Sequence, residues 1–341
     1  MDSEKYGHRT LSSAPLRVTC ATMRQARRID SVALSANDDK SRYVYLHKLY
    51  GERKEDVLSF IEKTSPTRWP SIDPEVFFYS ELNKINQNAV SPKYYGSKTT
   101  RHGTRIFLEH VQGPHPDLAK SAANIAKCIA YIERTTSERI YRWSFLKSRG
   151  YIFFDFFFSN NPRKILPQFD YIEIRKLQEN IQKTTGQSME LLTMINPIVR
   201  FLNSAGYAIK ERQKCFSHLD FRAQNLINSE GTLYLLDWGS AKIGRLGFDA
   251  GAYLAAMLMR QGVEPFTRTA SHFLSVYKDA ISPYFPWASV RENCNYIFLS
   301  RALLYFLKPT VIARHINSSR IDTLISKQKY LISLFDSIKS N

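Results

Sequence analysis

The chain has 341 residues, of which 43% are apolar, and a formal net charge of +17. This composition excludes gross disorder, and the length allows two domains or one large two-lobed unit. The positive charge favours anionic partners of any kind, from nucleic acid and nucleotides to phosphorylated metabolites and acidic membrane surfaces, so it selects no single function.

The four cysteines, Cys20, Cys128, Cys215 and Cys294, lie far apart and form no C-x-x-C pair. This spacing argues against a disulfide framework and against a zinc site. The N-terminal residues contain no apolar segment of the kind found in secretory signals, and no apolar run reaches the roughly 18 residues that a membrane span needs. We therefore expect a cytoplasmic protein without a membrane span.

The N-terminal third reads as a small β-rich region with one helix. The turn-forming stretch "ANDDK" lies between the segments "DSVALS" and "RYVYLHKLYG" as in a hairpin, and Pro74 opens a segment with apolar residues at helical spacing. The expected elements are an extension over 1–30, strands over 30–35, 42–51 and 56–64, a helix over 74–85 and a strand over 104–113.

From about residue 114 the pattern changes to long helices. The clearest helical segments are 117–136 and 188–212, the second with an expected end near Gly206, followed by 247–262 and a series over 266–338. Two short strands around a turn precede Asp237. We expect three parts: the extension 1–30, an N-lobe over 31–113 and a C-lobe over 114–341.

Polar residues interrupt the apolar stretch "FSHLDFRAQNLI" (216–227), and another acid follows in "LYLLDWG" (233–239). Phosphoryl transfer needs one carboxylate to take the proton of the attacking hydroxyl and oxygen ligands to hold Mg²⁺ against the nucleotide phosphates. Asp220 can supply the first group, and Asn225 with Asp237 the second. The competing explanation is an ordinary polar turn that joins two strands and is capped by the acids.

The segments "SHLDFRAQN", "YLLDWGSAKIG" and "FDAGAYLA" together resemble the aminoglycoside phosphotransferase / choline kinase family of the protein-kinase-like superfamily. The resemblance covers roughly 30–260 and is strong only over about 216–252. It implies an α+β, protein-kinase-like two-lobed fold, with a small β-rich N-lobe and a larger, mainly helical C-lobe. It also implies ATP and Mg²⁺ as cofactors.

The resemblance assigns roles to individual residues of this chain. Asp220 would be the catalytic base, and Asn225 and Asp237 the metal ligands. His218 would be a structural residue that holds the loop, and Asp249 a supporting acid in the C-lobe. An ordinary helix N-terminus also explains Asp249, since an acid there is favoured by the helix dipole.

The N-lobe of such a protein provides a lysine and a partner glutamate for the nucleotide phosphates. The resemblance places these roles on Lys63 and Glu75. Lys48 and Glu81 are their rivals, because an unaligned hairpin permits a slip of one strand. A glycine-rich phosphate loop is missing between the first two expected strands.

The segment "FLEHVQG" (107–113) would connect the lobes, with the backbone of Glu109, His110 and Val111 facing the adenine. Specificity would come from the C-lobe helices and from 140–190, where no motif is apparent. The apolar stretch 150–158 is interpreted as core or as a cover over the acceptor site.

The sequence departs from the family at Leu219, where glycine is common, and at Phe221 and Arg222. These changes touch the substrate side of the loop, so the acceptor stays open. The net charge argues mildly against strongly cationic acceptors, although local charge can oppose net charge.

We therefore expect an ATP-dependent phosphotransferase that acts on a hydroxyl of a small molecule. The alternatives are a kinase-like pseudokinase that binds nucleotide without turnover and a basic nucleic-acid-binding protein. The last predicts aromatic and basic residues interleaved on one face. The charges are scattered along the chain instead, so no specific nucleic-acid binding is expected. The sequence does not indicate an oligomeric state.

Overall fold

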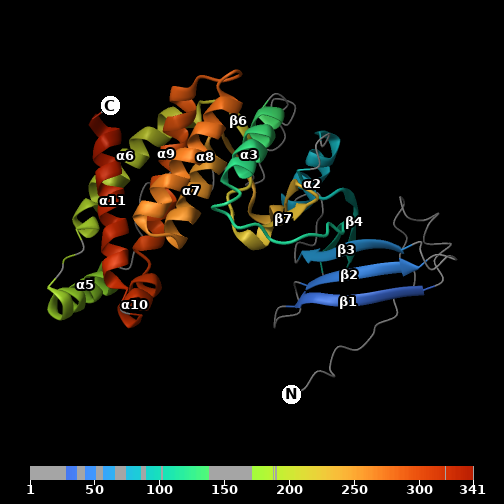
Figure 1. The fold of residues 1–341 in the computed structure, drawn as a ribbon, viewed down its shortest axis with the longest axis horizontal. Coiled ribbons are helices and arrows are strands. Elements are labelled where there is room, and N and C mark those ends of the chain that lie inside the picture. The colour runs from blue at the N-terminus through green and yellow to red at the C-terminus, as the bar shows by residue number, and fades with distance from the viewer. Residues whose placement is uncertain are drawn as a thin grey trace, which may run out of the picture. The chain divides into compact units, whose positions relative to one another are not determined.

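Figure 1 shows the fold in a computed structural model, which describes residues 28–36, 43–50, 57–65, 74–85, 90–100, 103–137, 171–186, 188, 190–318 and 320–340. The chain divides into two units. The first unit comprises Met1–His115 and Gln224–Ser240, and the second comprises Pro116–Ala223 and Ala241–Asn341. The segment 224–240, which follows most of the predicted catalytic loop, therefore belongs with the N-terminal residues.

Five strands of the first unit form one antiparallel sheet in the order β1-β2-β3-β5-β4. They are β1 (Arg28–Ala36), β2 (Tyr43–Tyr50), β3 (Val57–Ser65), β4 (Tyr94–Thr100) and β5 (Gly103–Glu109). β3 pairs with β2 on one side and β5 on the other, so its register is fixed from both edges. Burial alternates along it, with Phe60, Glu62 and Thr64 inside.

Helix α2 (Pro74–Ile85) begins at its proline, whose missing N–H costs nothing in the first turn. The first unit also contains the hairpin of β7 (Leu226–Ser229) and β8 (Thr232–Leu235). Its two turn residues, Glu230 and Gly231, have φ values of 51° and 82°. Two successive left-handed residues match the twist of the flanking strands, so this turn sets the hairpin register.

The second unit is mainly helical. Its helices are α3 (Ala122–Ser137), α5 (Tyr171–Thr185), α6 (Leu191–Lys210), α7 (Phe248–Arg260), α8 (Val263–Ile281), α9 (Trp287–Phe306), α10 (Pro309–Asn317) and α11 (Ile321–Ser340). The short strands β6 (Lys214–Ser217) and β9 (Lys242–Arg245) pair antiparallel. Rings from successive helices stack in the core, as do Tyr253 and Phe273 with centroids 4.4 Å apart.

Several boundaries differ from the sequence expectations. β5 ends at Glu109 rather than at Gly113, and α6 continues to Lys210, past Gly206. Strands β4, β6 and β9 were not expected; β6 and β9 have four residues each, too few to show alternation. The expected extension up to residue 27, the turn residues 37–40, the apolar stretch 150–158 and most of 140–190 lie outside the described residues.

Among the described residues, no single helix has both the length and the apolar character to cross a membrane. Helices α9 and α10 together meet the length and composition criteria as a pair bent by 61°.

Candidate active site

Lys63 lies in β3, the middle strand of the first unit's sheet. In β3 it stands opposite Val44 of β2 and Ile106 of β5. Because neighbouring residues of a strand point to opposite faces, Lys63 projects from the face opposite to that of the buried Glu62. The sheet therefore holds the base of the lysine rigidly on both sides.

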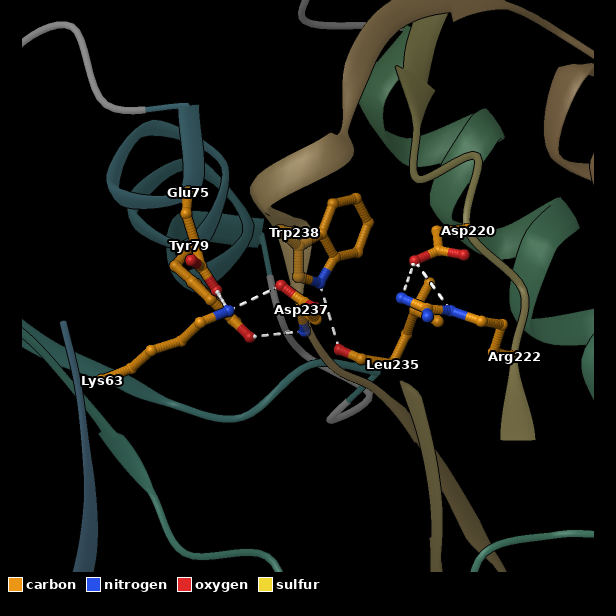
Figure 2. A network of polar contacts seen from close by, with 8 residues as sticks. All are labelled: Lys63, Glu75, Tyr79, Asp220, Arg222, Leu235, Asp237 and Trp238. Atoms are coloured by element: carbon orange, nitrogen blue, oxygen red, sulfur yellow. Dashed lines mark hydrogen bonds and ion pairs between the residues drawn. The ribbon is translucent and has the colours of Figure 1, made fainter. Parts of the chain in front are cut away.

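The ammonium of Lys63 contacts two carboxylates. Its Nζ lies 2.6 Å from Oε1 of Glu75, in the first turn of α2, and 2.6 Å from Oδ1 of Asp237 (Figure 2). Burial by itself lowers the pKa of Lys63, but the two carboxylates raise it above its ordinary value. Lys63 is therefore a fixed cation between two acids.

Helix α2 also holds the backbone around Asp237. The Asp237 N–H donates to the Tyr79 hydroxyl at 3.1 Å. The next residue, Trp238, is buried, its Nε1–H donates to the Leu235 carbonyl at 3.1 Å, and its ring stacks on Phe78 at 6.0 Å. Asp237 itself has a left-handed φ of 60°, and 44% of its side chain is accessible. Its carboxylate is thus anchored from behind and open to a ligand.

Asn225 closes a short 3₁₀ turn, Ala223–Asn225, and is buried. The backbone carbonyl of Asn225 accepts the N–H of Leu236 at 2.8 Å, so Asn225 is tied to the residue before Asp237. Amide and carboxylate oxygens are the ligands that Mg²⁺ prefers. The described residues contain no group of three or more His, Cys, Asp or Glu side chains that could hold a metal ion together. Two protein oxygens fit Mg²⁺, which is usually bound by one or two carboxylates together with substrate phosphates and water.

The predicted nucleotide segment follows β5. The Glu109 N–H donates to the Lys93 carbonyl at 2.9 Å, and Nδ1 of His110 lies 3.0 Å from the Ser59 hydroxyl. Burial lowers the pKa of His110, and Lys48 lowers it further. The imidazole is therefore biased towards its neutral form.

Gly113 fastens this segment to β7. Its φ is 153°, and a Cβ at this position would lie 2.1 Å from the Asn228 carbonyl oxygen. The Asn228 N–H donates to the Pro114 carbonyl at 3.0 Å, and Nδ1 of His115 lies 2.8 Å from the Leu226 carbonyl oxygen. Only glycine allows the two backbones to approach this closely.

In the second unit, the loop that carries Asp220 is held by a buried acid. The carboxylate of Asp249 accepts the N–H of His218 at 2.9 Å and the N–H of Leu219 at 2.8 Å. The buried His218 in turn accepts the Asp220 N–H at its Nδ1, at 3.2 Å. Asp249 thus does more than occupy a helix N-terminus, because it fixes the loop backbone before Asp220.

A second buried acid supports Asp249. The carboxylate of Glu133 accepts the N–H of Gly247 at 2.9 Å, the N–H of Asp249 at 3.2 Å and the hydroxyl of Tyr277. Burial raises the pKa of Glu133 to about 8 and that of Asp249 to about 7, because water that would stabilise the charged forms is absent.

Leu219, Phe221 and Arg222, where the sequence departs from the family pattern, have different environments. Leu219 and Phe221 are buried, and Leu219 has a left-handed φ of 66°. Arg222 has 54% of its side chain exposed, and its Nε and Nη2 lie 3.1 Å and 2.5 Å from Oδ2 of Asp220 (Figure 2). Of the three, only Arg222 presents its side chain to solvent.

The rival residues lie elsewhere in the first unit. Lys48 is exposed on β2, where its Cα partners are Asp30 and Ser59. Glu81 pairs with Lys84, one turn along α2.

Sequence reasoning missed three contributors. Tyr79 reads as part of the apolar stripe of α2, Glu133 reads as a charge on an amphipathic helix, and Gly113 reads only as a strand break. A glycine before a proline, at the end of a strand, was the one signal among these that could have been used.

The architecture is α+β and protein-kinase-like, with a small β-rich unit and a larger, mainly helical one, so the fold that the resemblance implied is confirmed. A choline kinase from Cryptosporidium parvum Iowa II has a TM-score of 0.53 and 13% identity, over 93% of this chain and 96% of its own. Amicoumacin kinase in complex with AMP-PNP, Ca²⁺ and Ami has a TM-score of 0.54 and 12% identity, over 88% of this chain and 87% of its own. No protein-family model and no curated protein matches the sequence.

Proposed function

We propose that this protein is an ATP-dependent phosphotransferase that moves the γ-phosphate to a hydroxyl of a small molecule. The observation that carries the proposal is the contact of Lys63 with both Glu75 and Asp237 in the first unit. A cation fixed between an anchoring glutamate and an exposed aspartate is the arrangement that a nucleotide phosphate and its metal require. The fold, which the chain shares with small-molecule kinases, supports the same reading.

In this proposal Lys63 binds the ATP phosphates and Glu75 keeps its ammonium in place. Asn225 and Asp237 hold Mg²⁺, which neutralises charge on the phosphate oxygens. The backbone of Glu109–Val111 binds the adenine.

Asp220 orients the acceptor and takes its proton. The acceptor oxygen forms a bond to the γ-phosphorus while the bond from that phosphorus to the bridging oxygen breaks. ADP leaves with the electron pair, and the hydroxyl proton passes to the Asp220 carboxylate. His218 and Asp249 position the loop through the hydrogen bonds described above.

The binding half of the proposal is tested by thermal unfolding with ATP, with and without Mg²⁺. A ligand at about 100 times its Kd stabilises the folded state by about 2.7 kcal/mol, which raises Tm by several degrees. We expect this Mg²⁺-dependent rise in the wild type and its loss in Asp237→Ala and Lys63→Ala. Lys48→Ala is the matched control, a lysine one strand away, and it should keep the rise.

Absence of any Mg²⁺-dependent shift in the wild type would refute the kinase reading. Equal losses in Lys48→Ala and Lys63→Ala would refute the assignment of the phosphate lysine.

Turnover is tested by ADP release over pooled hydroxyl compounds, with Asp220→Asn as the comparison. We expect the substitution to lower kcat by about 10²–10⁴-fold, the usual contribution of a positioned base. Full turnover in Asp220→Asn would rule out this base. Mg-ATP binding without turnover on any acceptor would favour the pseudokinase. Salt-sensitive nucleic-acid binding without Mg-ATP binding would favour the basic nucleic-acid-binding protein.

A further inference from the structure

The predicted base is paired with a solvent-exposed arginine. Two side-chain N–H groups of Arg222 point at Oδ2 of Asp220, and among the described residues the guanidinium makes no other hydrogen bond. A guanidinium has five N–H groups in a planar fork, so three remain for a ligand. Because Leu219 and Phe221 are buried, Arg222 is the departure from the family pattern that can reach an acceptor.

A second arginine of the same unit acts on the same acid. Arg301 of α9 interacts electrostatically with Asp249 and Asp220. Its Nε is buried and, within the described part of the chain, has no hydrogen-bond partner, while the residue as a whole is partly accessible. A buried donor without a partner is costly, and a bound anion would offset that cost.

We propose that the acceptor carries an oxyanion, a carboxylate or a phosphate, beside its reactive hydroxyl, and that Arg222 selects it with the charge of Arg301 in support. The proposal rests on the phosphotransferase function and names its substrate class. Carboxylates and phosphates match the arginine fork in geometry as well as in charge.

The same pair explains how an anion would favour the transfer. In the free protein Arg222 lies against Oδ2 of Asp220, an oxygen suited to accept the hydroxyl proton. An oxyanion that draws the guanidinium away from Asp220 gives Arg222 a new partner and leaves Oδ2 to the hydroxyl beside it. A cationic acceptor would instead approach the guanidinium of Arg222, and a neutral one would leave the ion pair in place.

Binding of inorganic phosphate tests the proposal without need of the true acceptor. The protein is first saturated with AMP-PNP and Mg²⁺, so that the nucleotide site is closed to phosphate, and ionic strength is held constant. We expect Arg222→Met to weaken phosphate binding by about tenfold to a hundredfold, the range for a hydrogen bond to a charged group. Arg268→Met is the control, since Arg268 also forms an exposed ion pair, with Glu264 on α8.

Turnover over a panel sorted by charge gives the second readout. The panel contains hydroxy acids, phosphorylated alcohols, neutral polyols and amino alcohols, so its first two arms separate carboxylate from phosphate. We expect the best acceptor to be anionic, Arg222→Met to raise its KM, Arg222→Lys to restore part of the loss, and Arg222→Glu to shift preference towards amino alcohols.

A best acceptor that is neutral or cationic overturns the inference, as does phosphate binding that is absent or unchanged in Arg222→Met. Mg-ATP stabilisation is measured separately, so these outcomes leave the kinase proposal standing. Absence of Mg²⁺-dependent stabilisation by ATP in the wild type refutes both proposals.

Discussion

The left-handed leucine in the loop that carries Asp220 gives the sharpest stability prediction. A left-handed φ costs a non-glycine residue about 1–2 kcal/mol, and Leu219 has a φ of 66°. Replacing this buried leucine by alanine removes its packing at a cost of about 2–5 kcal/mol and keeps the strain. Leu219→Gly loses the same packing but relieves the strain. Glycine normally costs about 0.5–1 kcal/mol relative to alanine, so Leu219→Gly should be the more stable variant by about 0.5–1 kcal/mol.

Urea unfolding of the two variants measures this difference. The control pair is Leu254→Ala and Leu254→Gly, because Leu254 is also buried in the second unit but lies within α7. There alanine should be the more stable replacement by about 1 kcal/mol. The opposite order at the two positions is the expected result. A glycine variant at 219 that is no more stable than the alanine variant would show that the loop holds no such strain.

Two further substitutions test the supports of the site. Gly113→Ala should lower the free energy of unfolding by about 3 kcal/mol or more, since its Cβ would lie 2.1 Å from the Asn228 carbonyl oxygen; a change below about 1 kcal/mol in urea unfolding would contradict this contact. The pKa values of Glu133 and Asp249 are raised in the native protein. As pH rises from about 4 towards 7, the unfolded chain therefore releases protons that the native protein keeps. The free energy of unfolding then falls by about 1.4 kcal/mol per pH unit for each retained proton. Glu133→Gln should flatten this fall. Parallel pH profiles of the free energy of unfolding for the wild type and Glu133→Gln would exclude a retained proton on Glu133.

The sequence predicted best where a local pattern was long enough to be read. The helix over 74–85 matches α2 in both bounds, because Pro74 marks its start and its apolar spacing continues for three turns. The first three strands also lie close to their expected ranges, and the first two flank the turn-forming stretch that marks them as a hairpin. β9 escaped prediction because its four residues carry almost no periodic signal, whereas the equally short β7 and β8 flank a turn that marks them.

The supports of the site could not be read from local pattern at all. Glu133 and Asp249 lie 116 residues apart in sequence, and nothing near Glu133 distinguishes it from a solvated helix charge. Tyr79 fits the apolar stripe of α2, and its hydroxyl acquires a role only when the backbone of Asp237 reaches it. Contacts of this kind depend on tertiary packing, which a single sequence does not encode at short range.

Helix α2 contacts both Lys63 and the backbone of Asp237 in the first unit. Glu75, Phe78 and Tyr79 stand at i, i+3 and i+4, so they lie on one face of the helix. Glu75 binds the ammonium of Lys63, Phe78 stacks on Trp238, and Tyr79 accepts the N–H of Asp237. A shift of α2 would therefore disturb the proposed phosphate lysine and the proposed metal ligand together. Burial raises the pKa of the Tyr79 hydroxyl well above its ordinary value, so the hydroxyl keeps its proton at any physiological pH. The position of this one helix thus decides whether both groups are in place for a nucleotide.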